Sequence, residues 1–159
     1  MKRFVLLLLT VCIVCAQVNA ASPPDLRTVA EKTAWKSTSN YEETLSFLRE
    51  LCRLQPAFKL TRFGVSPQGR ELPLLIVSRE RAFTPNAARA LPKPIVLIQN
   101  GIHSGEIDGK DAMLQILREI ATGHAKSLLD AATLLVIPIY NVDGHERISP
   151  YNRPNQDGP

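Results

Sequence analysis

Four apolar residues, 95–98, run directly into the polar, glycine-containing stretch 99–106. Prolines precede the apolar run and an Asn-Gly pair follows it, which predicts a short strand that is buried on both faces. Beyond Gly109, apolar residues recur at the spacing of a helix, up to a stop at Gly123. The members of this repeat are Ala112, Met113, Ile116, Leu117 and Ile120. The pattern therefore predicts strand, turn and helix, with His103 and Glu106 in the turn.

His103 and Glu106 are candidate metal ligands. In open α/β sheets, ligands bind at the carboxyl ends of strands, which is where this turn lies. Residues three apart at a helix start can point the same way, and Gly101 and Gly105 allow the backbone to bend tightly around them. A catalytic zinc needs three protein ligands and a position for water, and both imidazole and carboxylate groups serve. We therefore predict that His103 and Glu106 bind one Zn²⁺ ion.

Taken alone, a His-x-x-Glu spacing is weak evidence. Glu106 also suits a cap at the start of the helix, and His103 also suits a hydrogen bond to a backbone carbonyl. The position after a buried strand and between glycines makes the zinc interpretation more specific. Zincin, hydrolase-elbow and phosphate-loop motifs are excluded by the residues around His145-Glu146, Ser104 and Gly109-Lys110, respectively.

The remaining elements are a helix, a hairpin and a second buried strand. A Ser39–Glu42 capping box predicts a helix that ends before Pro56. Segments 58–63 and 71–77, joined by a Gly/Pro-rich connection, predict an antiparallel hairpin in which Pro73 suits an edge or a strand start. Segment 134–140 predicts the buried strand, which ends at a polar loop. The apolar face of the helix consists of Tyr41, Leu45, Leu48, Leu51 and Cys52, and the polar loop is Asn141-Val142-Asp143-Gly144.

These elements indicate an α/β fold with a mixed parallel/antiparallel sheet and flanking helices. The strand–helix–strand unit is expected to cross over right-handed. The loops after Ile98 and Tyr140 then lie on the same edge of the sheet. His124, beside Gly123, is expected to be a helix-end residue.

Residues 1–20 are typical of a signal peptide, with two basic residues, an apolar stretch and small residues before Ala21. We expect the protein to be secreted or periplasmic, without stable membrane insertion after cleavage. Residues 21–36 are expected to form an extended arm. Residues 151–159 have loop chemistry with no closing strand or helix after them, which predicts that the chain is the amino-terminal part of a longer protein.

Charge and cysteine content narrow the class of protein further. Loss of Lys2 and Arg3 lowers the Lys+Arg count from 19 to 17 against 15 acidic residues, so the net charge falls from +4 to +2. The absence of a basic run with interleaved aromatics argues against nucleic acid as a partner.

After cleavage of the signal peptide only Cys52 remains, and one thiol cannot form an intrachain disulfide. We expect Cys52 to be a buried packing residue, with a reactive thiol as the alternative.

The two polar loops together resemble those of the zinc carboxypeptidase family, carboxypeptidase A type. The resemblance covers about residues 37–159, and it includes the segment from Gly69 to Leu74, which is similar to the second strand of the family. It implies that His103 and Glu106 are zinc ligands in the amino-terminal part of a catalytic domain. That domain would be truncated after the second core strand–helix–strand unit. Val142 stands where the family turn has proline.

The activity implied by the resemblance is removal of residues from the C-terminus of peptides by a metal-activated water. In the family, the third ligand, the substrate-binding arginines and the glutamate base lie further along the chain. The 159 residues are therefore expected to bind zinc weakly and to be inactive alone. Asn152-Arg153 follows the second loop too closely to be the family's substrate clamp. Two alternatives are a zinc deacylase of the aspartoacylase kind and a non-catalytic binding module on the same scaffold.

Overall fold

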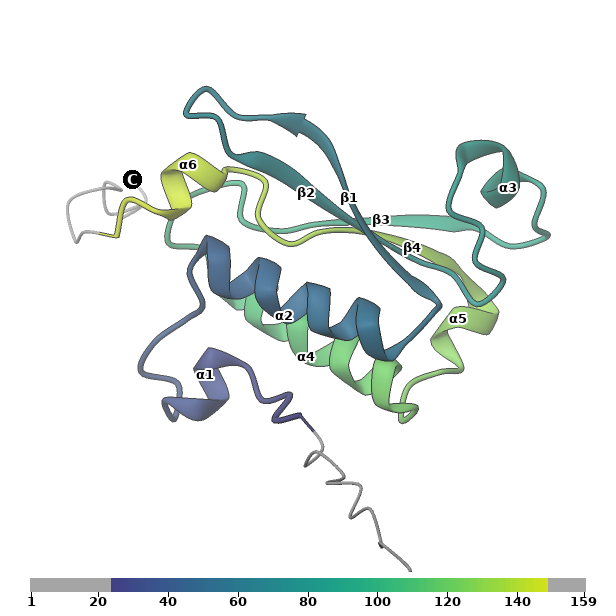
Figure 1. The fold of residues 1–159 in the computed structure, drawn as a ribbon, viewed down its shortest axis with the longest axis horizontal. Coiled ribbons are helices and arrows are strands. Elements are labelled where there is room, and N and C mark those ends of the chain that lie inside the picture. Colours follow the sequence, from purple (N-terminus) through teal and green to yellow (C-terminus); the bar gives the residue numbers. More distant parts are fainter. Residues whose placement is uncertain (1–23, 149–159) are drawn as a thin grey trace, which may run out of the picture.

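The computed structural model describes residues 24–148 of the chain. Four strands form one sheet in the order β1-β2-β4-β3. Helices α2 (Tyr41–Leu54) and α4 (Asp108–Thr122) lie side by side along one face of this sheet (Figure 1). The main core is formed between these two helices and β2 and β4. The short helices α3 (Pro85–Arg89) and α5 (Leu128–Ala131) lie at one end of the sheet, and α6 (Val142–His145) lies at the other.

Strands β1 (Phe58–Val65) and β2 (Glu71–Val77) form the predicted antiparallel hairpin. The position of Pro73 corrects one expectation, because β2 is an inner strand of the sheet. Its pairing with β4 begins only at Leu75, so Pro73 faces β1 alone, next to a register irregularity between Arg62 and Gly64. The proline therefore removes no hydrogen bond from the β2–β4 ladder.

Strands β3 (Ile95–Gln99) and β4 (Thr133–Ile137) pair in parallel, which confirms the mixed sheet. The prediction that β3 is buried on both faces is wrong. Ile95, Val96 and Leu97 are 40%, 40% and 57% exposed. Within residues 24–148, β3 pairs only with β4, so it forms an edge of the sheet. The second apolar run behaves as predicted in β4, although the strand ends at Ile137 rather than at position 140.

Helix α2 begins one residue later than the predicted capping box. Asn40, not Ser39, is the cap, and Asn40 Oδ1 accepts a hydrogen bond from Glu43 N at 2.8 Å. Ser39 is instead buried, with its hydroxyl 2.9 Å from that of Thr44. The predicted apolar face is buried at Tyr41, Leu45, Leu48 and Leu51. Cys52 is half-buried against the main core, and burial raises the pKa of its thiol, as expected for a packing residue.

Helix α4 ends at Gly123, whose φ of 98° supplies the predicted left-handed cap. Its buried face is rotated from the predicted one. Met113, Leu117 and Ile120 are buried as expected, but Ala112 and Ile116 are exposed. The remaining buried positions of this helix are Lys110, Asp111 and Leu114. This set follows the i, i+3, i+4, i+7 spacing of one helical face.

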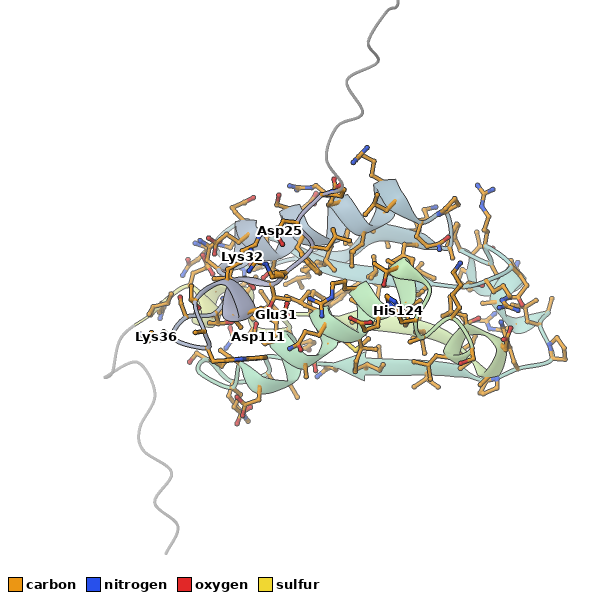
Figure 2. The ribbon with its side chains drawn as sticks, turned by 90° about the horizontal axis from the view of Figure 1, so that it is seen from below. Asp25, Glu31, Lys32, Lys36, Asp111 and His124 are labelled. Carbon is orange, nitrogen blue, oxygen red and sulfur yellow. The ribbon has the colours of Figure 1, made fainter. Side chains whose placement is uncertain are left out.

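The segment expected to be an extended arm contains a helix, α1 (Val29–Lys32). Thr28 and Glu31 form a capping box, a signal that was present in the sequence. Glu31 also accepts a hydrogen bond from Arg118 Nη1 of α4 at 2.5 Å. Figure 2 shows Glu31 and Asp111 on the side of the molecule where α1 meets α4. This ion pair holds the segment against the helix layer.

Several expectations lie outside the described residues. These are the signal peptide, the start of the arm, the loop 151–159 and the Asn152-Arg153 pair. Within residues 24–148, no helix has both the length and the apolar character that a membrane span requires.

Candidate metal centre

The loops after β3 and β4 meet at the carboxyl edge of the sheet, as the parallel pairing predicted. Three backbone hydrogen bonds of 2.9 Å join them, from Asn100 N to Ile137 O, from Tyr140 N to Asn100 O and from Asn141 N to Gly101 O. Gly101 is required at this contact. Its φ is 61°, and a Cβ built there would lie 3.3 Å from the backbone of Ile139. The close approach of the two loops therefore depends on a residue without a side chain.

His103 and Glu106 converge in the first of these loops. His103 Nδ1 lies 3.0 Å from Glu106 Oε2, and the two side chains are 58% and 47% exposed. Both residues precede α4, whose N-cap is Ile107, and Ile107 makes no side-chain cap hydrogen bond. Neither side chain lies within the packed face of the helix. The pair therefore presents a nitrogen and an oxygen to solvent at one point of the sheet edge.

A complete metal site needs more than this pair. Over residues 24–148, no group of three or more His, Cys, Asp and Glu side chains is close enough to hold a metal ion. His124 does not contribute, because it follows the left-handed cap at the far end of α4 from Asp111 (Figure 2). There it contacts Thr122 and Glu119, which confirms it as a helix-end residue. The described residues thus supply two candidate ligands.

The second loop is anchored through Asp143. Its Oδ1 accepts hydrogen bonds from Arg70 Nη1 at 2.7 Å and Ser66 Oγ at 2.9 Å, and its Oδ2 accepts one from Gln68 N at 3.2 Å. Burial alone would raise the pKa of Asp143, but the bonds from Arg70 and Ser66 outweigh it and lower the pKa. The carboxylate therefore fastens the turn of the β1–β2 hairpin to the loop after β4.

A cavity of ≈ 310 Å³ opens between the hairpin turn and the two loops. Ile102 of the first loop and Tyr140 and Asn141 of the second line it, opposite Val65 and Leu72 of the hairpin. The Tyr140 ring stacks on Phe63, with 6.1 Å between centroids. The first loop thus reaches this partly apolar hollow through Ile102, the residue before His103.

We expect Asp143→Asn to remove an acid-dependent part of the stability. Because the pKa of Asp143 lies below its ordinary 3.8, its stabilising effect is present above that pH and is lost as the pH falls through the lowered pKa. Urea unfolding of wild type and variant should therefore show a difference in free energy that shrinks on acidification. For Arg70→Met, the difference in unfolding free energy from wild type should likewise shrink as the pH falls. A difference that does not change with pH would contradict this assignment.

A second polar cluster near this edge was missed in the sequence. The side chain of Lys110 is buried, and its Nζ contacts the Ser39 carbonyl and His145 Nε2, the latter at 2.9 Å. His145 Nδ1 lies 2.8 Å from Glu146 Oε1. Lys110 occupies the buried face of α4, three residues before Met113 and seven before Leu117. That spacing was the available signal, because it places a lysine on an apolar helix face.

Comparison with known proteins bears on most of the chain. Residues 44–158 match the model of the zinc carboxypeptidase family. Carboxypeptidase 2 of Trichophyton rubrum is 32% identical over 107 residues, which are 65% of this chain and 20% of that protein. The inactive metallocarboxypeptidase ecm14 of Schizosaccharomyces pombe is 30% identical over 118 residues, 70% of this chain and 24% of that protein. The chain thus spans a quarter or less of the length of these two relatives.

Solved structures show the same fold. Bovine thrombin-activatable fibrinolysis inhibitor, solved with a tick carboxypeptidase inhibitor, superposes with a TM-score of 0.59 at 22% identity, covering 72% of this chain and 35% of that one. Carboxypeptidase A from Helicoverpa armigera superposes with a TM-score of 0.57 at 22% identity, covering 68% of this chain and 25% of that one. Because residues 44–158, more than two thirds of this chain, match the family model, the chain belongs to the zinc carboxypeptidase family.

Proposed function

We propose that this chain is the amino-terminal part of an exported zinc carboxypeptidase and that His103 and Glu106 are two of its three zinc ligands. The observation that carries the proposal is the convergence of these two side chains at the carboxyl edge of the sheet, in a chain of the zinc carboxypeptidase family. Residues 37–159 are then part of the catalytic domain, and residues 1–20 direct export. The third ligand, a histidine in the family, lies outside the described residues.

The pair fits zinc in both chemistry and spacing. One neutral nitrogen and one carboxylate oxygen are donors that zinc accepts, and the carboxylate offsets part of the charge of the ion. Two ligands of a tetrahedral zinc lie roughly 3.4 Å apart at bond lengths of about 2.1 Å. Nδ1 and Oε2 are 3.0 Å apart, so a small side-chain rotation accommodates an ion. Their exposure leaves the site open to ion and substrate.

The chain's own residues then act mainly by positioning. When bound, zinc lowers the pKa of a coordinated water to about 7 and polarises a carbonyl. His103 and Glu106 hold their donor atoms at the sheet edge, because the Gly101 contact and the loop–loop hydrogen bonds fix the turn. Asp143 holds the neighbouring loop through Arg70 and Ser66. The hollow beside Ile102 and Tyr140 offers space for a peptide near the ligands.

The similar proteins bear differently on the two alternatives, the zinc deacylase and the non-catalytic module. The matches to carboxypeptidases favour a peptide substrate over the acylated amino acids of a deacylase. A non-catalytic module has one specific observation in its favour, since the similar protein ecm14 is an inactive metallocarboxypeptidase. In that case the scaffold would persist without hydrolysis.

Removal of the metal tests the proposal. We expect the protein expressed from its complete gene to release C-terminal residues from peptides, to lose this activity when zinc is chelated and to regain it when zinc is restored. Released amino acids and acyl groups, measured on peptides and on acylated amino acids, separate peptidase from deacylase. Zinc binding without release of either product would favour the non-catalytic module and contradict the proposal.

A further inference from the structure

The buried ammonium group of Lys110 has no part in the chemistry proposed above. Lys110 is 1% exposed and lies in the first turn of α4. A charge there loses its hydration and faces the positive end of the helix dipole, and both effects oppose it. An apolar side chain of similar size would pack without these costs. Local stability therefore does not account for a lysine at this position.

Its hydrogen bonds form a directed network. A charged lysine has donors only, so His145 Nε2 must accept the bond from Lys110 Nζ. The proton of the neutral imidazole then lies on Nδ1, which donates to Glu146 Oε1. The same oxygen accepts a hydrogen bond from Tyr41 N at 2.9 Å. We refer to Lys110, His145, Glu146, Ser39 and Tyr41 as the Lys110 network.

The Lys110 network joins three segments at one end of the molecule. Lys110 belongs to the start of α4, four residues after Glu106, and His145 is the last residue of α6. Ser39 and Tyr41 belong to the start of α2. Figure 1 shows the beginnings of α2 and α4 at the same end of the sheet as α6. The network therefore joins the start of α4, which follows the first loop of the candidate metal centre, to the end of α6, and none of these bonds involves His103 or Glu106.

We propose that Lys110 is a positioning residue for the metal centre, holding the start of α4 and the His103–Glu106 turn against the loop after β4 through His145 and Glu146. This inference rests on the proposed function, in which His103 and Glu106 bind zinc. Groups that orient metal ligands from outside the coordination sphere contribute about 10–100-fold in metal affinity. A shift of α4 by a fraction of an ångström would move Glu106 relative to His103.

The network is sensitive to acid. The charged groups that face His145 are Lys110 and Asp111 of α4 and its neighbour Glu146, while Glu43 of α2 acts on Lys110. Burial, and then the charge of Lys110, lower the pKa of His145 below its ordinary 6.5. His145 is therefore neutral, and able to accept the hydrogen bond from Lys110, at pH values above this lowered pKa. As the pH falls through the lowered pKa, His145 becomes a second cation beside Lys110 and the contact turns repulsive.

The test compares zinc affinity in variants of the protein expressed from its complete gene, measured by competition with a chelating dye at neutral pH. We expect Lys110→Met to weaken zinc binding about 10-fold or more. The affinity is measured well below the unfolding temperature of the variant. Lys110→Arg is expected to recover much of the loss. Lys126→Met, which removes an exposed lysine beyond the far end of α4, is the matched control. Wild-type zinc affinity in folded Lys110→Met would overturn the proposal.

His145→Gln keeps the test decisive should Lys110→Met fail to fold. A glutamine offers an oxygen to Lys110 and an N–H to Glu146 but does not titrate. We expect zinc affinity close to wild type at neutral pH and a smaller loss of affinity under mildly acidic conditions. An acid loss identical to that of wild type would overturn the proposal. His103→Ala separates the two claims, because retained zinc there defeats the proposed function, whereas lost zinc there with intact binding in Lys110→Met defeats only the positioning role.

Discussion

In the protein expressed from its complete gene, we expect His103→Ala and Glu106→Ala each to weaken zinc binding by more than about 100-fold, since groups outside the coordination sphere already contribute about 10–100-fold. If the proposed function is right, peptide hydrolysis is expected to fall in proportion to the zinc that each variant retains. Each substitution removes one of two converging donor atoms, 3.0 Å apart at an exposed edge of the sheet. The measurement is the zinc content of purified protein together with a titration of the metal-free form.

His124→Ala and Glu119→Ala are the matched controls, because they change the same residue types near the other end of α4. Both are expected to keep wild-type zinc affinity. If His103→Ala and Glu106→Ala bind zinc as tightly as these controls, neither residue is a ligand. Thermal unfolding of all four variants shows whether a loss of zinc reflects a loss of fold.

The second large effect is on stability, at Leu117. This side chain is fully buried between α4, α2 and the sheet, whereas Ile116 on the same helix is 42% exposed. Leu117→Ala should lower the free energy of unfolding by about 2–5 kcal/mol, because it removes buried methyl groups and leaves a cavity. Ile116→Ala should change it by about 0.5 kcal/mol or less. Denaturant unfolding of the two variants is the measurement.

This pair also tests how α4 is oriented. The sequence periodicity placed Ile116 and Leu117 on the same apolar face, and the structure separates them. Equal losses of stability in the two variants would contradict the observed orientation. A larger loss for Ile116→Ala would mean that the helix is rotated towards the face that the periodicity predicted.

Local sequence signals predicted much of the fold. The hairpin follows from two β-rich segments around a Gly/Pro turn, and the parallel pair from two apolar runs separated by a helix. The meeting of the two polar loops follows from that parallel pairing. Gly123 at the end of α4 was predicted because a left-handed cap favours glycine. The hairpin and the cap depend on a few neighbouring residues, and the parallel pair depends on the order of strand, helix and strand along the chain.

The errors arise where burial depends on distant partners. The apolar run of β3 is typical of an inner strand, but its exposure is set by which strands lie beside it. Ala112 was expected on the buried face of α4 but is exposed, because packing against α2 and the sheet selects which face of the helix is buried. Asn40 rather than Ser39 caps α2, and the hydroxyl of Ser39 instead contacts that of the buried Thr44. None of these contacts is encoded in local periodicity.

In the candidate site, too, contacts within one loop were predictable and contacts between distant segments were not. The spacing of His103 and Glu106 after a strand predicted their convergence, and the structure places their donor atoms 3.0 Å apart. The spacing of Lys110 on an apolar helix face was a signal, but its partners were not predictable, because Ser39 and His145 are far from it in sequence. Asp143 was recognised only as part of a polar loop, since its partner Arg70 lies in another element.

The position of the metal tests the account most directly. Crystals of the protein expressed from its complete gene, grown with zinc, can be measured by anomalous diffraction at the zinc absorption edge. We predict one strong peak about 2.0–2.2 Å from a ring nitrogen of His103 and a carboxylate oxygen of Glu106. A zinc peak away from both side chains, in a protein that still hydrolyses peptides, would contradict the assignment of these residues as the metal centre.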